Sequence, residues 1–210
     1  MIFWDLDGPI LDVSEKYYSV YKDILLEKNA TTLTKDVFWK LKRSRVSIEE
    51  ILTRSNSQSL VELYKKLWFD RIETLKYLEK DSLQPGVIDV LKQCKQKNNL
   101  VMVTLRQRRE KLLTQLKQLN LTQYFDDILD SGDDIKPRWK IKYNLIKDYL
   151  NDNDGKVHTI IGDTETDILA GNNLGFISIA VLCGIRNEEL LKAKPTKYFY
   201  KSHELMEIFT

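Results

Sequence analysis

Acidic side chains with a spacing suited to metal binding or acid–base chemistry stand near the start of the chain. An apolar run at residues 2–4 leads into Asp-Leu-Asp-Gly at residues 5–8, which is typical of a buried strand that ends in two carboxylates. Residues two apart face the same side of a strand, and a glycine lets the chain turn directly after them. We therefore expect Asp5 and Asp7 to converge on one pocket, as ligands of a hard metal ion or as a nucleophile and its proton donor. The four residues alone would also fit an acidic turn after an edge strand.

Two later apolar segments also end in residues that could do chemistry. Residues 100–103 lead to Thr104 and Arg106, and residues 159–161 lead to a segment that contributes Asp163 and Asp167. Between these segments lies a cluster of lysines: Lys136, Lys140 and Lys142. So many carboxylates beside a hydroxyl and an ammonium group would be costly unless they bind a divalent cation and an anion together. A phosphate ester with Mg²⁺ would satisfy both requirements.

The elements that must position these residues alternate after the turn at Pro85-Gly86. Apolar periodicity predicts strands near 100–103, 124–129, 159–161, 177–182 and 197–200, and helices near 87–91, 112–119, 141–149, 168–174, 188–191 and 202–209. Such alternation favours a Rossmann-like, doubly wound parallel sheet, whose functional residues collect at the carboxyl ends of the strands.

The segment from 13 to 83 is different, because its periodicity is helical throughout. It predicts helices near 13–25, 34–43 and 47–54, a long helix from Ser59 to Leu78, and no strand. We interpret its aromatic residues as packing: Phe38, Trp39, Tyr64, Trp68 and Phe69. We therefore expect an α/β core made of residues 1–12 and 84–210, with an inserted all-helical cap at 13–83.

Composition excludes several classes of protein. The 210 residues include 33 Lys and Arg against 31 Asp and Glu, so a formal net charge of +2 gives no argument for a nucleic acid or an anionic membrane as partner. Two cysteines are too few for a disulfide framework. No signal peptide or run of transmembrane length is apparent, so we expect a cytoplasmic protein. The sequence carries no indication of the oligomeric state.

Together these motifs resemble the haloacid dehalogenase superfamily, most closely its phosphoglycolate phosphatase-like members with a helical cap. The family's first motif, a strand followed by Asp-x-Asp-Gly, corresponds to residues 2–12, and its second, a strand ending in a hydroxyl, to residues 101–104. The motif Gly-Asp-Thr-x-x-Asp-Ile-x-Ala-Gly corresponds to residues 162–171. The resemblance covers nearly the whole chain, although the cap matches in position rather than in residues.

The resemblance implies a role for each matching residue. Asp5 would be the nucleophile and Asp7 the general acid and base, and Thr104 would bind the phosphoryl group. Mg²⁺ would be held by Asp5, the Asp7 carbonyl and Asp163, with support from Asp167. For the catalytic lysine we favour Lys136 over Lys142, while Lys140 has the poorer helical phase.

The chain departs from the family pattern at two places. Pro9 stands where the family usually has Thr or Val, and Leu105 and Arg106 follow Thr104 where an Asn is frequent. Arg106 could supply a phosphate or substrate contact, or it could be a surface arginine.

The function expected from these residues is that of a Mg²⁺-dependent phosphomonoester hydrolase acting through an aspartyl-phosphate on a small phosphorylated metabolite, phosphoglycolate-like or a sugar phosphate. A phosphomutase of the same superfamily is the alternative enzyme. A non-catalytic phosphate- or protein-binding domain is the alternative from another class, and it would be favoured if the acidic residues and the lysine were missing, whereas all are present.

Overall fold

A parallel sheet forms the centre of the larger part of the protein. The computed structural model describes residues 1–131, 137–150 and 156–209. Every neighbouring pair of strands in the sheet is parallel. The six strands are, in spatial order, β5 (Asp127–Asp130), β4 (Leu100–Thr104), β1 (Ile2–Trp4), β6 (Thr159–Gly162), β7 (Ile177–Val181) and β8 (Lys197–Phe199). This arrangement confirms the predicted α/β, doubly wound core.

Helices cover both faces of this sheet because its strands are apolar on both sides. On one face, Trp4 and Met102 pack with residues of α6 (Val87–Lys95) and α7 (Arg109–Gln118). On the other, Phe3 packs with α8 (Trp139–Leu150) and α9 (Glu165–Asn173). The remaining helical pieces of the core are 3-10 helices: Thr122–Tyr124, Glu188–Ala193 and Ser202–Ile208. The last two lie where the sequence predicts helices, near residues 188–191 and 202–209, without specifying the helix type.

A separate group of helices is inserted in the chain between β1 and β4, the first two strands of the sheet in sequence order. It consists of α1 (Ser14–Leu26), α2 (Lys35–Arg43), α3 (Ile48–Arg54), α4 (Val61–Arg71) and α5 (Leu75–Leu78), with a 3-10 turn at Gln58–Leu60. These cap helices have their own apolar core, in which the rings of Tyr21 and Phe38 stack with centroids 4.4 Å apart. They form the inserted all-helical cap that the sequence predicts.

The cap helices differ from the prediction in two details. The single helix predicted from Ser59 to Leu78 is interrupted, because the chain turns after α4 and Glu73 accepts hydrogen bonds from the backbone N–H groups of Gln107 and Arg108 in the core. A short antiparallel pair, β2 (Leu11–Asp12) and β3 (Ser82–Leu83), joins the two crossings between core and cap. No strand was predicted at either place.

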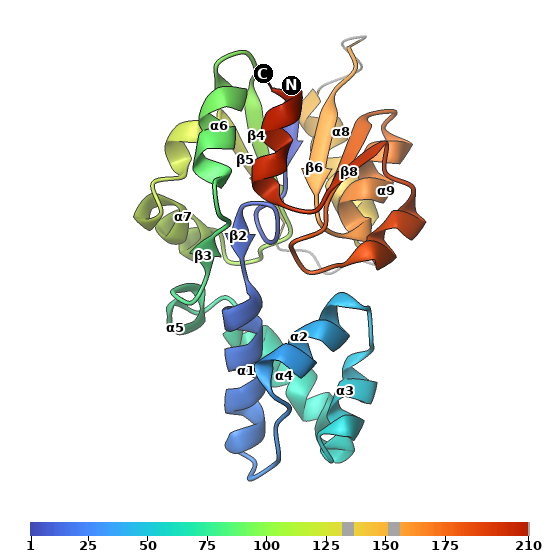
Figure 1. Cartoon of the computed structure of the whole chain (residues 1–210). Coiled ribbons are helices and arrows are strands. Elements are labelled where there is room, and N and C mark those ends of the chain that lie inside the picture. Colours follow the sequence, from blue (N-terminus) through green and yellow to red (C-terminus); the bar gives the residue numbers. More distant parts are fainter. Residues whose placement is uncertain (132–136, 151–155, 210) are drawn as a thin grey trace.

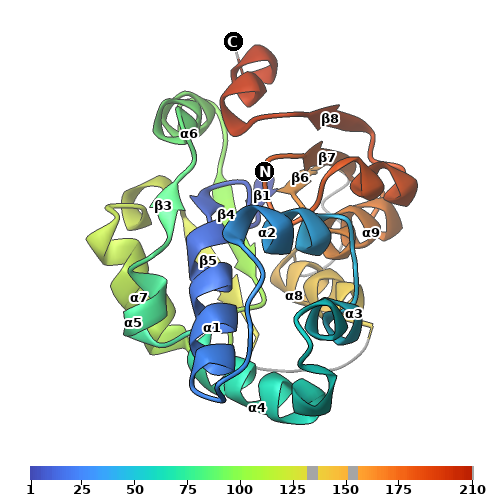
Figure 2. The ribbon, with the colours of Figure 1, turned by 60° about the horizontal axis from the view of Figure 1, so that its bottom comes forward.

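The cap helices lie at the carboxyl end of the parallel strands, while both termini lie at the opposite end (Figure 1). When this end is turned forward, α1 and α2 stand in front of the core (Figure 2). Among the described residues, no helix is both long and apolar enough to cross a membrane.

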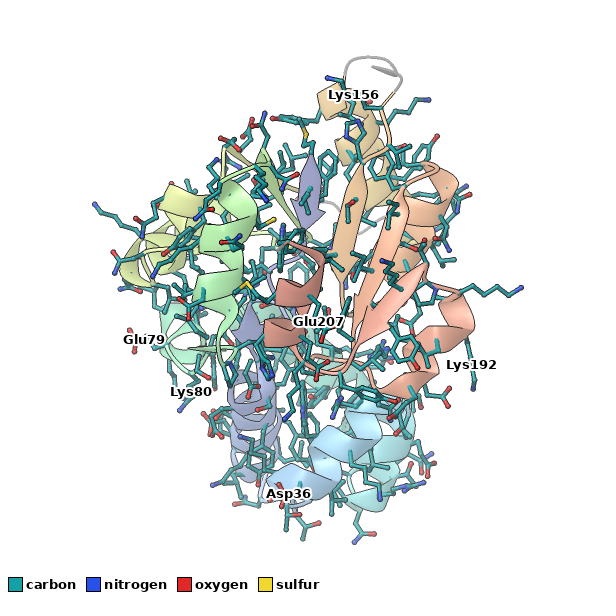
Figure 3. The ribbon with its side chains drawn as sticks, turned by 45° about the horizontal axis from the view of Figure 1, so that its top comes forward. Asp36, Glu79, Lys80, Lys156, Lys192 and Glu207 are labelled. Atoms are coloured by element: carbon teal, nitrogen blue, oxygen red, sulfur yellow. The ribbon has the colours of Figure 1, made fainter. Side chains whose placement is uncertain are left out.

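Most charged side chains point outward, as Figure 3 shows for Asp36 on α2, Glu79 after α5 and Lys192 in the 3-10 helix Glu188–Ala193. The exceptions are a set of buried charged residues near the carboxyl ends of the strands: Asp5, Lys16, Asp81, Arg106, Lys142, Asp163 and Asp167. Buried charges need partners. Their arrangement therefore defines the candidate site.

Candidate active site

The turn after β1 places the two N-terminal acids. The backbone N–H of Asp5 still donates to the Ile161 carbonyl at 2.9 Å, so Asp5 is fixed at the centre of the sheet. The chain then turns through Gly8, whose φ of 108° is one that other residues rarely adopt. Asp5 is 7% exposed. Its carboxylate and that of Asp7 both line the same cavity, as predicted from their spacing.

Three carboxylates meet at the end of β1 and β6. Asp5, Asp163 and Asp167 each offer an oxygen, and these oxygens lie within 4.8 Å of one another. Asp163 directly follows β6, and Asp167 stands in the first turn of α9, where it accepts hydrogen bonds from the backbone N–H and the hydroxyl of Thr164. The Oδ1 atom of Asp163 is buried without a hydrogen-bond partner among the described residues. Such a group of oxygens is the donor set that Mg²⁺ prefers.

Burial and the mutual repulsion of these acids raise the pKa of two of them. Burial, followed by the charge of Asp167, raises the pKa of Asp5 to about 7. Burial and the charges of Asp5 and Asp167 raise the pKa of Asp163 well above its usual range. A bound divalent cation would relieve this repulsion and favour the ionised forms.

Lys142, on α8, supplies the positive charge nearest to these acids. Its Nζ lies 2.8 Å from Oδ1 of Asp5 and also contacts Asp167. Burial alone would lower the pKa of Lys142, but the charges of Asp167 and Asp5 raise it, so the side chain is an ammonium at neutral pH. Lys140 is exposed, with its Nζ 5.9 Å from the centroid of the Trp139 ring. The favoured Lys136 lies outside the described residues.

Asp7 has different neighbours from Asp5. Arg106 binds its carboxylate through two hydrogen bonds, and Lys16 Nζ lies 3.3 Å from its Oδ1. Burial would raise the pKa of Asp7, but the charges of Arg106 and Lys16 outweigh it and hold the pKa well below the usual range. The Asp7 carboxylate does not belong to the group of three acids. Arg106 is 4% exposed, so it is not a surface residue; it lines the cavity beside Asp7, and its contact with a substrate stays a prediction.

Asp81 completes this second cluster of charges. It accepts hydrogen bonds from Lys16 at 2.7 Å, from Arg106 at 3.2 Å and from the Gln115 amide at 2.8 Å. The sequence analysis missed Lys16 and Asp81, because neither belongs to a motif. The one available signal was the position of Lys16 beside the apolar residues of its helix, and a lysine there is usually solvated.

Thr104 is the last residue of β4 and is 2% exposed. Its hydroxyl oxygen accepts a hydrogen bond from the backbone N–H of Arg106 at 3.4 Å, which leaves the hydroxyl proton free to donate to a ligand. Thr104 lines the same cavity as Asp5 and Lys142. These three side chains could therefore surround one phosphoryl group.

Two glycines leave the space that Asp163 occupies. A Cβ at Gly8 would lie 2.0 Å from Oδ2 of Asp163, and a Cβ at Gly184 would lie 2.1 Å from the same atom. That oxygen accepts a hydrogen bond from the backbone N–H of Ile185. Neither glycine could be replaced without moving the carboxylate, so both loops are shaped around it.

A cavity of about 520 Å³ connects this base to the cap helices. The cap side of the cavity is largely aromatic and aliphatic, with contributions from Tyr17, Phe38, Ile48, Tyr64, Trp68 and Phe69. Most of the aromatic residues that the sequence analysis assigned to packing therefore also face the cavity, although Phe38 and Tyr64 belong to the apolar core of the cap.

Several known proteins resemble this chain in sequence. Residues 2–181 match the family model described as haloacid dehalogenase-like hydrolase. The chain is 25% identical over 207 residues to a protein of Caldanaerobacter subterraneus named "Putative pyrophosphatase PpaX", a match that covers 94% of this chain and 88% of that protein.

Solved structures share the fold. A haloacid dehalogenase-like hydrolase of Streptococcus pneumoniae aligns with a TM-score of 0.78 and 21% identity, over 100% of this chain and 97% of that one. A "predicted phosphoglycolate phosphatase" of Haemophilus somnus 129PT aligns with a TM-score of 0.69 and 18% identity, over 100% and 97% of the two chains. Because the family model matches residues 2–181 of its 210 residues, the chain belongs to the haloacid dehalogenase-like hydrolases.

Proposed function

We propose that this chain is a Mg²⁺-dependent phosphomonoester hydrolase that acts through an aspartyl-phosphate on a small phosphorylated metabolite. The observation that carries the proposal is the 2.8 Å contact between Asp5 and Lys142 inside a buried group that also contains Asp163 and Asp167. These charges are the ones needed to hold a divalent cation and a phosphoryl group together. Membership of the hydrolase family supports the same reaction class.

The residues fit a Mg²⁺ ion on two observations. Three carboxylate oxygens lie within 4.8 Å of one another, and one buried oxygen of Asp163 has no other described partner. Asp5, Asp163 and Asp167 would hold the ion, together with the main-chain carbonyl of Asp7. When bound, Mg²⁺ would neutralise phosphoryl charge and so lower the repulsion between the phosphate ester and Asp5.

The remaining chemistry belongs to side chains of this chain. A carboxylate oxygen of Asp5 attacks phosphorus, the ester P–O bond breaks, and Asp7 donates a proton to the leaving alcohol. Water then attacks phosphorus, Asp7 accepts a proton from it, and the bond to Asp5 breaks to release phosphate. Thr104 and Lys142 donate hydrogen bonds to the phosphoryl oxygens as charge redistributes.

Asp7 must alternate between two protonation states in this scheme. Beside Arg106 and Lys16 it is ionised, which is the form that accepts a proton from water in the second step. The first step requires protonated Asp7. A weaker contact with Arg106 would favour this form, because the charge of Arg106 lowers the pKa of Asp7. In the same scheme residues 13–83 act as a cap that covers the cavity, excludes water and selects the leaving group.

Phosphate release from an aryl phosphate, with Mg²⁺ and with a chelator, tests the proposal. We expect release that depends on Mg²⁺ in the wild type and is lost in Asp5→Asn, with an unchanged circular dichroism spectrum in the variant. Asp36→Asn is the matched control, because Asp36 is an exposed residue of α2 that does not line the cavity. Release that persists in Asp5→Asn, or that ignores the chelator, would contradict the mechanism.

A further inference from the structure

Lys42, in the last turn of α2, is a cation of the cavity wall that forms no ion pair with a described residue. Its Nζ lies 5.4 Å from the centroid of the Tyr17 ring and 5.8 Å from that of Trp68. Lys42 lines the cavity and is partly buried. Within the described part of the chain, no carboxylate lies within ion-pair distance of it.

Most of the other basic residues of the cavity wall have carboxylate partners. Lys16 and Arg106 pair with Asp7, Lys65 pairs with Glu49, Lys142 pairs with Asp5, and Arg186 pairs with Glu165. Arg138 and Arg108, which also line the cavity, have no carboxylate partner for their side chains among the described residues, although Arg108 donates to the backbone carbonyl of Asp70. Among the described residues, Lys42 and Arg138 are therefore two cations of the wall that have no carboxylate partner and lie near enough to repel each other.

The neighbours of Lys42 add to its charge instead of neutralising it. Burial, and then the guanidinium groups of Arg186 and Arg138, lower the pKa of Lys42 to about 8, so the amine is still protonated at neutral pH. The two aromatic rings compensate in part, since the face of an aromatic ring attracts a cation. An anion in the cavity would compensate the remaining charge directly.

A purely structural role for Lys42 would rest on the helix dipole. Lys40, Lys42 and Arg43 all stand in the last turn of α2, where positive charge is favourable. Arg43 also donates to the carbonyls of Leu182 and Arg186 in the core. Lys40 is exposed, however, and shares the dipole without facing the cavity. It is therefore a matched control for the charge of Lys42.

The rest of the cap wall limits what else could bind there. Ile48, Ile51, Trp68 and Phe69 offer few hydrogen bonds to the hydroxyl groups of a sugar. Of the charged side chains on the same wall, Lys65 already pairs with Glu49, and Glu73 accepts hydrogen bonds from the core backbone. A leaving group that fits this wall is a short carbon chain with a negative charge. We propose that Lys42 binds a second anionic group of the substrate, so that the preferred substrates are phosphate monoesters whose leaving group carries a carboxylate or a second phosphate. This inference rests on the proposed phosphatase function.

A series of synthetic esters tests the inference. Each pair has the same carbon chain, from two to five carbons, and differs only in its far end: the monophosphate of a diol is neutral there, and the phosphate of an ω-hydroxy acid carries a carboxylate. The bisphosphates of the same diols form a third arm, which separates a preference for phosphate from one for carboxylate. Values of kcat and KM are measured for wild type, Lys42→Met, Lys42→Arg and Lys40→Met.

We expect the wild type to prefer one anionic arm at one chain length. Lys42→Met should raise KM for that ester about 10- to 100-fold, the loss expected for one hydrogen bond between charged groups, and should change KM for the neutral ester less than about threefold. Lys42→Arg should retain most of the preference, and Lys40→Met all of it. Equal KM values for neutral and anionic esters in the wild type would overturn the inference. So would a Lys42→Met variant in which KM rises equally for neutral and anionic esters.

A binding measurement separates this inference from the proposed function. Asp5→Asn protein, in which turnover is blocked, is titrated calorimetrically with the same esters, with and without Lys42→Met. If no ester is hydrolysed by the wild type, the phosphatase proposal fails, and the calorimetric comparison still decides whether Lys42 binds the second anion. If neutral and anionic esters bind Asp5→Asn equally, the inference about Lys42 fails while hydrolysis stands.

Discussion

Arg106 donates two hydrogen bonds to the carboxylate of Asp7, from Nε to Oδ2 at 2.7 Å and from Nη2 to Oδ1 at 2.6 Å. Two parallel bonds of this kind fix both the position and the plane of a carboxylate. The candidate acid and base is therefore oriented by a residue 99 positions away in the sequence.

Replacement of Arg106 by Gln should raise the pKa of Asp7, because the largest opposing charge is removed while burial remains. The limb of the pH profile of kcat that reports Asp7 should then move to higher pH. Arg108→Gln is the control, since Arg108 also lines the cavity but donates to the Asp70 carbonyl. An identical profile in wild type and Arg106→Gln would mean that Asp7 does not titrate in the rate-limiting step.

Replacement of Asp81 by Ala should destabilise the protein by about 3–5 kcal/mol, the usual cost of removing one partner from a buried group of charges. Lys16 and Arg106 would then share Asp7 alone. The free energy of unfolding in urea measures the effect. Asp89→Ala should cost less than about 0.5 kcal/mol, because Asp89 pairs with Lys92 on the surface at 3.7 Å. Similar losses in the two variants would show that the buried cluster contributes little.

Replacement of Gly184 by Ala should weaken Mg²⁺ binding strongly, because the new methyl group would lie 2.1 Å from Oδ2 of Asp163. Gly175→Ala is the contrasting variant, since nothing lies within 4 Å of its Cβ position, although its φ is +73°. It should cost about 1 kcal/mol of stability through backbone strain, with unchanged Mg²⁺ affinity. The shift in unfolding midpoint during a Mg²⁺ titration compares the two.

The metal-free protein should become less stable as the pH rises from about 4 to about 7. The pKa of Asp5 is about 7 in the folded protein, whereas the ordinary value of 3.8 applies to the unfolded chain. In this pH window the folded state therefore binds more protons than the unfolded state, and its stability falls as protons become scarcer. Urea unfolding in the presence of a chelator measures the slope, and Asp5→Asn should reduce it. Mg²⁺ affinity should increase over the same window, because the ion binds ionised Asp5. A slope unchanged by Asp5→Asn would contradict the raised pKa.

Lysine variants decide which of the three candidate lysines acts in the reaction. Lys142→Met should lower kcat by at least about 100-fold, since it removes the donor nearest to Asp5, whereas Lys140→Met should stay within about twofold of the wild type. Lys136→Met tests the lysine favoured from the sequence. A large loss in Lys136→Met with an active Lys142→Met would restore that assignment.

The fold and the base of the site follow from local patterns, whereas the contacts of Asp7 do not. Asp5, Thr104 and Asp163 each end a short apolar strand, and parallel strands bring their carboxyl ends to one edge, so their proximity could be predicted. The contact of Lys16 with Asp81 joins residues 65 positions apart, and no periodicity encodes it.

The interruption between α4 and α5 has a similar cause. The apolar pattern continues from residue 60 to residue 78, but Glu73 is directed to the backbone of Gln107 and Arg108 in the core. The choice among the lysines also depended on tertiary structure. Lys142 lies on the side of α8 that contains the buried Ile141 and Ile146, and helical phase alone did not separate it from Lys136.

The strand pair of β2 and β3 restricts how the cap can move. Both crossings between cap and core pass through this pair, where Leu11 faces Leu83 and Asp12 faces Ser82, and the next residue, Gln84, donates to the Ile10 and Gly8 carbonyls. Two crossings fixed side by side prevent the cap from sliding across the sheet. A rotation about the axis through the pair would change how widely the cavity opens while Asp5, Thr104 and Lys142 keep their positions relative to one another. Such a rotation would have to break the contacts that Arg43 and Glu73 make with the core.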